Sequence, residues 1–199
     1  MYAFCWAPYA DESTPFAAER KIWEDSKWGQ GGHATEEEIE AVGLGGAGTG
    51  VKGLMCKHRW RGEFFTSGSP VGSMGRALYD AVASLLETHS YEHFHLVGHS
   101  LGAQMSLSCM GFLLALTAQK QNLVLPQRLT LLDPYFSNFS KGYLGGEWVG
   151  ARARRVVEMA RERGVAVEQY KSSMVLNNPF SGTNHKLTLL TAYTVLYPR

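Results

Sequence analysis

The chain has 199 residues, a length that suits one domain with a sizeable buried core. Lysine plus arginine number 19 and aspartate plus glutamate number 18, so charge favours neither nucleic acid nor an acidic membrane surface as a partner. The longest apolar run is far shorter than the roughly 20 residues of a membrane span, and the start lacks the pattern of a signal peptide. We therefore expect a single domain over residues 1–199, without a nucleic-acid partner or an integral membrane segment.

The cysteines and the charged residues argue against two kinds of site. Cys5, Cys56 and Cys109 are scattered, odd in number and show no C-x-x-C spacing, which disfavours a zinc site and a disulfide framework. No H-E-x-x-H motif or paired-carboxylate spacing indicates another metal site. We expect free, buried thiols, no bound metal and no cofactor.

The first third of the chain gives only weak predictions of regular structure. Residues 1–6 (MYAFCW) form a short apolar run that is typical of a buried strand. Residues 17–28 predict one or two helical turns, and residues 35–42 start with a threonine cap signal. Residues 43–53 are rich in glycine, as in the phosphate-binding loop of a nucleotide-binding unit. In such a unit a strand precedes the loop and a helix follows it, and neither is predicted here, so we expect an ordinary loop.

From residue 74 onward, predicted helices and strands alternate. The apolar period of residues 74–88 predicts a helix that packs Leu78, Val82 and Leu85 against a sheet. Further elements are predicted as strands at 94–98, 128–133 and 165–170, as helices at 103–119 and 151–163, and as either type at 186–197. Because near-continuous apolar strands alternate with helices, we predict an α/β fold with a mostly parallel sheet and helices on both faces.

The most informative motif is GHSLG at residues 98–102, which matches G-x-S-x-G. A nucleophilic serine in this motif stands on a sharp turn between a strand and a helix, and both elements are predicted around Ser100. The N–H of Leu101, at the helix start, can then face a developing oxyanion. The alternative is a strand-to-helix loop in which Ser100 only caps the helix. We favour the interpretation in which Ser100 is a catalytic nucleophile.

In the hydrolase order that goes with this motif, a catalytic acid and then a histidine follow the serine along the chain. Asp133 ends the next predicted strand, where an acid that orients the histidine is expected, although an aspartate before Pro134 also suits a simple turn. His185 is the sole histidine downstream of Asp133, and its alternative role is that of a solvent-exposed loop residue. The general base is therefore His185 or a residue absent from this chain.

These motifs resemble the neutral-lipase side of the α/β-hydrolase superfamily. The resemblance rests on residues 98–102 after the strand HFHLV and on the Leu-Asp-Pro segment at residues 132–134, where such lipases carry the acid. Other stretches, including 58–61 (HRWR) and 168–173 (EQYKSS), are similar to lipase-like hydrolases and extend the resemblance over nearly the whole chain. It implies an α/β-hydrolase-like fold and a lipase or carboxylesterase that cleaves carboxylic (lipid) esters through an acyl-enzyme.

The resemblance also implies two parts that this chain lacks. In such hydrolases a strand and a His-Gly type loop, which supplies the second oxyanion donor, precede the strand that resembles residues 1–6. The family's histidine lies in a loop beyond a final strand, and residues 186–197 resemble the approach to that strand, so His185 comes too early. We therefore expect a truncated hydrolase-like chain. Two hypotheses stay open: an active lipase or carboxylesterase, and an inactive hydrolase-like module that acts by binding or interaction.

Overall fold

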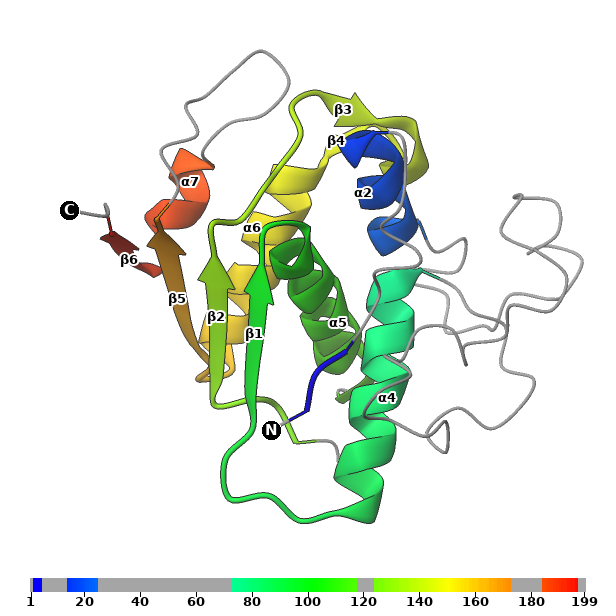
Figure 1. The fold of residues 1–199 in the computed structure, drawn as a ribbon, viewed down its shortest axis with the longest axis vertical. Coiled ribbons are helices and arrows are strands. Elements are labelled where there is room, and N and C mark those ends of the chain that lie inside the picture. Colours follow the sequence, from blue (N-terminus) through cyan, green and yellow to red (C-terminus); the bar gives the residue numbers. More distant parts are fainter. Residues whose placement is uncertain (1, 5–13, 25–72, 118–123, 173–183, 197–199) are drawn as a thin grey trace, which may run out of the picture.

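The computed structural model describes residues 2–4, 14–24, 73–117, 124–172 and 184–196. Figure 1 shows the arrangement of the elements in this part of the chain. In chain order they are α2 (Pro15–Trp23), α4 (Met74–Thr88), β1 (His95–His99), α5 (Leu101–Thr117), β2 (Arg128–Leu132), β3 (Ser140–Lys141), the short 3₁₀ helix η2 (Gly142–Leu144), β4 (Glu147–Trp148), α6 (Val149–Glu162), β5 (Ala166–Lys171), α7 (His185–Thr188) and β6 (Ala192–Val195).

A parallel four-stranded sheet organises this part of the chain, with the strand order β1-β2-β5-β6. His99 pairs with Leu132, and Leu132 pairs with Tyr170, so the first three strands end at the same level. The carboxyl ends therefore share one edge of the sheet (Figure 1), which is where α/β sheets place their ligand sites. The separate pair β3-β4 is antiparallel. The predicted α/β architecture with a mostly parallel sheet is confirmed.

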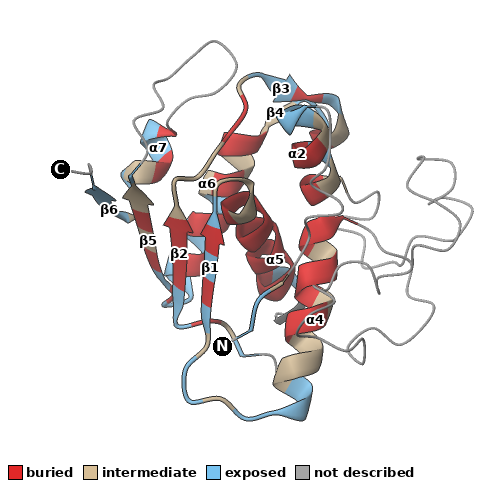
Figure 2. Ribbon diagram, in the orientation of Figure 1, coloured by how far each residue is buried: buried red, intermediate tan, exposed pale blue. Residues whose placement is uncertain are grey.

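The described helices cover one face of the sheet. α5 packs on β1 and β2, α6 packs on β5, and α2 and α4 contact α5. The residues of β1 alternate between exposed and buried (Figure 2). Val97, on the outer face, has 53% of its surface exposed. Helices on both faces were predicted from the apolar strands, but among the described elements only one face of β1 is covered.

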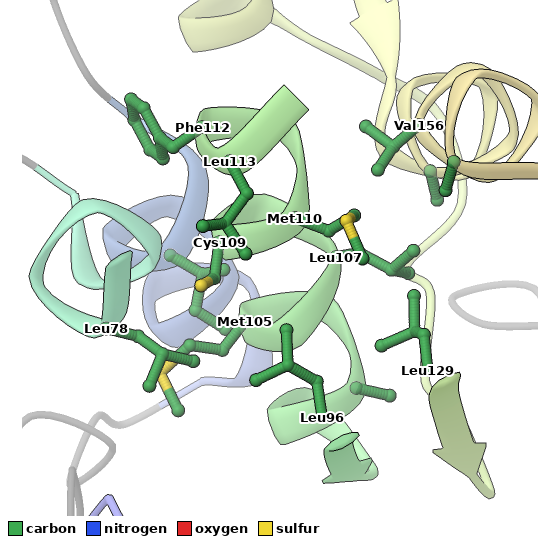
Figure 3. Close-up of a cluster of buried hydrophobic side chains, with 14 of the residues drawn as sticks. Leu78, Leu96, Met105, Leu107, Cys109, Met110, Phe112, Leu113, Leu129 and Val156 are labelled. Atoms are coloured by element: carbon green, nitrogen blue, oxygen red, sulfur yellow. The ribbon is translucent and has the colours of Figure 1, made fainter. Parts of the chain in front are cut away.

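Helix α5 forms the centre of the hydrophobic core, which explains why it is apolar on all sides. Figure 3 shows Leu107 and Met110 on the side of α5 that faces Val156 of α6 and Leu129 of β2. Other core side chains of α5 extend toward α4 and its Leu78 (Figure 3). A helix enclosed by a sheet and three other helices has no polar face to expose, so its sequence shows no amphipathic period.

Helix α4 has the predicted bounds, but its packing partner is different. Its N-cap Ser73 accepts a hydrogen bond from the Arg76 N–H at 3.2 Å. Leu78 and Val82 are buried as predicted, yet α4 packs mainly on α5 and not on the sheet. The two helices approach closely because α4 carries Gly75, where an added Cβ would lie 2.0 Å from the hydroxyl oxygen of Ser108.

The remaining predictions have mixed outcomes. The helix predicted at 17–28 is α2, which starts earlier at Pro15, and the ambiguous segment 186–197 contains most of α7 and all of β6. Residues 2–4 of the predicted first strand belong to no helix or strand. Cys109 is a free, buried thiol as expected. The predictions for residues 35–42 and 43–53, and for the other two cysteines, lie outside the described residues. Of the helices described, none has both the length and the apolar character to cross a membrane.

Candidate active site

Ser100 stands between β1 and α5, at the carboxyl edge of the sheet. Its N–H donates to the carbonyl oxygen of Leu132 at 2.9 Å, and its own carbonyl oxygen accepts from the N–H of Ala103 at 3.1 Å. These bonds connect Ser100 to the end of β2 and to the first turn of α5. The φ angle of Ser100 is +54°, a conformation that costs energy in a residue with a Cβ. A sharp, strained turn is the geometry of a serine on a nucleophile elbow.

The two glycines of the motif have different roles. A Cβ on Gly98 would lie 2.3 Å from the carbonyl oxygen of Gly102 and 2.6 Å from the Cα of Ala103, so this glycine permits α5 to cross close to β1. A Cβ on Gly102 would meet nothing within 4 Å. The close crossing of strand and helix therefore requires glycine at position 98 but not at position 102.

Asp133 follows β2 in the position that Ser100 holds after β1. Its N–H donates to the carbonyl oxygen of Tyr170 at 2.8 Å. One carboxylate oxygen accepts from the Ser172 N–H at 2.7 Å, and the other accepts from the Ser172 hydroxyl. The Tyr135 N–H contacts the carbonyl oxygen of Ser100 at 3.4 Å, so the turns after β1 and β2 touch. The structure thus brings the predicted nucleophile and acid onto neighbouring turns.

Ser100 and Asp133 share an unusual backbone conformation. Among the described residues, three that are not glycine have a positive φ: Ser100 at +54°, Asp133 at +43° and Phe139 at +73°. Aspartate tolerates this region better than most residues, whereas a bulky phenylalanine does not. Strained residues cluster at functional sites in many proteins, because the surrounding structure must hold them in place. Two of the three are the residues that the sequence singled out for catalysis.

His185 is the first residue of α7. Its neighbour Asn184 caps this helix by accepting from the Leu187 N–H at 3.2 Å, and its side-chain amide donates to the carbonyl oxygen of Gly150 at 2.8 Å. Figure 1 shows α7 beyond the carboxyl end of β5, the same edge that carries Ser100 and Asp133. The His185 side chain is exposed, and no hydrogen bond joins it to Ser100 or Asp133 in the described part of the chain.

Leu101 is the residue whose N–H the sequence predicts as an oxyanion donor. It begins α5 directly after Ser100, and its N–H has no hydrogen-bond acceptor among the described residues. The first N–H groups of a helix have no partner within the helix, and they lie at the positive end of its dipole. A developing negative charge on a substrate beside Ser100 would be stabilised there.

A second polar cluster, which the sequence motifs do not indicate, surrounds Glu19 of α2. Glu19 is completely buried, at 0% exposed. Its Oε2 accepts from the side chain of Gln104 at 2.9 Å and from the Ser137 N–H at 3.1 Å. Its Oε1 accepts from the hydroxyl groups of Ser137 and Tyr143, the latter at 3.2 Å, and Lys141 Nζ lies 3.7 Å away. We call these five residues the Glu19 cluster.

Gln104 connects the Glu19 cluster to the turn at Ser100. It lies in the first turn of α5 and is completely buried. Its amide nitrogen donates to the carbonyl oxygen of Tyr135 as well as to Glu19, and its amide oxygen accepts from the indole of Trp23 at 2.7 Å. The Tyr135 N–H in turn contacts the carbonyl oxygen of Ser100. Tyr135 therefore connects the Glu19 cluster to the predicted nucleophile.

The two tyrosines near Glu19 remain protonated at neutral pH. Burial raises the pKa of the Tyr143 phenol, and the charge of Glu19 and the hydrogen bond to it raise this pKa further. Burial, with a smaller effect of the Glu19 charge, also raises the pKa of Tyr135. Tyr143 therefore keeps the proton that it donates to the buried carboxylate.

One sequence signal could have identified the cluster. Glu19 lies three and four residues before Ile22 and Trp23, so a charged side chain occupies the buried stripe of α2. Gln104 is similarly a buried polar side chain in the largely apolar helix α5. A polar side chain at a buried helical position requires partners, but the sequence cannot say which residues supply them.

Comparison of the chain with protein-family models, with curated proteins and with solved structures gives no match. Within the described residues, no group of three or more His, Cys, Asp or Glu side chains is arranged to hold a metal ion. The chemistry of the site is therefore inferred from its own residues.

Proposed function

We propose that this chain is a serine hydrolase of the lipase or carboxylesterase type, which cleaves carboxylic esters, including lipid esters. The observation that carries this proposal is the strained Ser100 between β1 and α5, with Asp133 on the neighbouring turn. A serine that only capped a helix would not need a positive φ, since N-cap residues adopt extended backbone conformations. The resemblance of the two motifs to neutral lipases agrees with this geometry.

In the proposed mechanism, Ser100 Oγ attacks the ester carbonyl carbon while the histidine takes its proton. The carbonyl oxygen becomes an oxyanion that the Leu101 N–H stabilises. The intermediate then expels the alcohol, which receives the proton from the histidine, and leaves an acyl group on Ser100. Water, deprotonated by the same histidine, hydrolyses the acyl-enzyme and regenerates the serine. Asp133 orients the histidine and stabilises its charged form.

The general base in this mechanism is His185 or a histidine that this sequence does not contain. His185 follows the acid in chain order, as the hydrolase arrangement requires. Its position at the start of α7, at the carboxyl edge of the sheet, supports a role beside Asp133. For catalysis its ring must come within hydrogen-bonding distance of Ser100, and such contacts tighten when substrate binds in many enzymes.

A second candidate function is that of a catalytically inactive hydrolase-like module that acts by binding. Two observations favour it. The His185 ring is exposed and makes no hydrogen bond to the other two residues within the described part of the chain. The Asp133 carboxylate already accepts two hydrogen bonds from Ser172. An aspartate held in this way also suits a purely structural turn.

Covalent labelling with a fluorophosphonate probe separates the two functions. An active hydrolase is labelled at Ser100, and Ser100→Ala abolishes the label, because the probe requires an activated serine. The matched control is Ser90→Ala, since Ser90 is an exposed serine before β1. If folded wild-type protein is not labelled, or if Ser100→Ala still is, the hydrolase proposal is wrong.

The base is tested with two histidine variants. If His185 is the base, His185→Ala slows ester hydrolysis on the order of 10³-fold or more, because the serine loses its proton acceptor. His93→Ala is the control, since His93 is also exposed but lies at the amino end of β1. Equal rates for the two variants would exclude His185 as the base.

A further inference from the structure

We propose that Glu19 is a positioning residue, which holds the segment from Tyr135 to Ser137 against α5 and thereby fixes Asp133 relative to Ser100. This inference rests on the proposed function, because it assigns Glu19 a role in the proposed catalytic site. Glu19 lies more than 100 positions before this segment in the sequence, so the contact exists only in the folded chain.

The buried carboxylate fixes Ser137 from two directions. Ser137 is completely buried, and both its N–H and its hydroxyl donate to Glu19. Its carbonyl oxygen accepts from the indole of Trp148 at 2.6 Å. All the polar groups of Ser137 are therefore bonded. A bond from a neutral donor to an ionised acceptor is about twice as strong as a bond between neutral groups.

The same carboxylate fixes the helix side of the contact. Gln104 donates to both Glu19 and the carbonyl oxygen of Tyr135, so its amide lies between α2 and the segment after Asp133. Gln104 lies in the turn of α5 that follows Ser100. Glu19 and Gln104 together thus join the turn that carries the nucleophile to the segment that follows the acid.

A carboxylate side chain is suited to this position because hydrogen-bond donors surround it. Gln104, Ser137 and Tyr143 all donate to it, and Lys141 neutralises its charge from 3.7 Å. Lys141 is itself nearly buried, with 10% of its side chain exposed. A buried charge without such partners would be strongly destabilising. If Glu19 only filled space in the core, an apolar residue would fill the same space at a lower cost in stability.

The test compares Glu19→Ala with Glu19→Gln. Alanine removes every acceptor, so the segment is released, kcat for a p-nitrophenyl ester falls by about 100-fold and KM changes less. Glutamine can still accept from Gln104 and the Ser137 N–H through its amide oxygen, while its amide nitrogen faces hydroxyl groups that can accept. Lys141 loses its counter-charge in both variants but keeps its bond to the carbonyl oxygen of Asn138, so Glu19→Gln is expected to restore part of kcat. Glu158→Ala, which changes an exposed glutamate on α6, is the matched control and leaves kcat unchanged.

A second measurement separates this inference from the proposed function. The amide protons of residues 135–137 should exchange faster in Glu19→Ala than in wild type, and the Glu158→Ala control should not differ. If wild-type protein is not labelled by the fluorophosphonate, the proposed function fails, while amide exchange still decides whether Glu19 holds the segment. If folded Glu19→Ala keeps wild-type kcat and wild-type exchange, the positioning role is wrong.

Glu19→Ala could also fail to fold, and Gln104→Met then decides the question. Methionine has a similar volume but removes the bonds to Glu19 and to the Tyr135 carbonyl. We expect a fall in kcat of about tenfold and faster exchange in the same segment. Unchanged kcat and exchange in folded Gln104→Met would equally overturn the proposal.

Discussion

Beside the predicted nucleophile, Gly98 leaves no room for a side chain, and substitution to alanine should disrupt the packing there. The added Cβ would lie 2.3 Å from the Gly102 carbonyl oxygen and 2.6 Å from the Ala103 Cα. Both neighbours are backbone atoms at the start of α5, so the clash cannot be relieved by rotating a side chain. Overpacking of this kind costs about 1–3 kcal/mol. For a domain of this size, a loss of 2 kcal/mol lowers Tm by roughly 4–8 °C.

Gly102→Ala is the matched control, because it makes the same change four residues later. A Cβ there meets nothing within 4 Å, and the residue lies in α5 without a positive φ. Alanine is preferred over glycine in a helix, so this variant should be unchanged or more stable by about 0.5 kcal/mol. Urea denaturation measures both free energies of unfolding. Equal stability of the two variants would refute the assignment of Gly98 as the close contact.

Three further predictions concern a titrating histidine, a buried thiol and the acid. Burial, followed by the charge of Arg128, lowers the pKa of His95 below its usual 6.5. The unfolded chain therefore binds the proton more tightly than the folded chain. The contribution of His95 to the free energy of unfolding is fully present above pH 6.5 and is lost as the pH falls below that value. In urea denaturation, His95→Gln should show a weaker pH dependence of this free energy. Cys109 is fully buried and burial raises its pKa, so mass spectrometry should find it alkylated only after unfolding; rapid alkylation of the native protein would contradict this placement. Ser172→Ala removes the hydroxyl donor to Asp133 and should lower the free energy of unfolding by about 1 kcal/mol, whereas the exposed Ser90→Ala should have no effect.

Local sequence patterns were sufficient for the elements near the predicted nucleophile. The strand at 94–98, the helix at 103–119 and the strand at 128–133 correspond to β1, α5 and β2, with ends that differ by a few residues. Each pattern reports which positions of one element are buried, and that information is contained within a single stretch of sequence. The position of Ser100 on the turn between strand and helix follows from the same local patterns.

The partners of buried residues were harder to predict. The sequence predicts that the apolar stripe of α4 packs against the sheet, but its partner is α5. The prediction is wrong because an apolar stripe does not specify which apolar surface it contacts. For the same reason, continuous apolar strands suggested helices on both faces, while Val97 is exposed. Glu19 shows the limit most clearly, since all its partners come from distant parts of the chain.

The sequence by itself determined the alternation of strands and helices, the turn at Ser100 and the place of Asp133 at the end of the next strand. These features depend on residues within a few positions of one another, where periodicity and turn chemistry act directly. Only the tertiary structure decided that the two turns touch, that Ser172 donates hydrogen bonds to Asp133 and that a buried glutamate from α2 accepts hydrogen bonds from Ser137. Such contacts depend on the packing of whole elements, because a hydrogen-bond donor can be satisfied by any acceptor that the fold brings within reach.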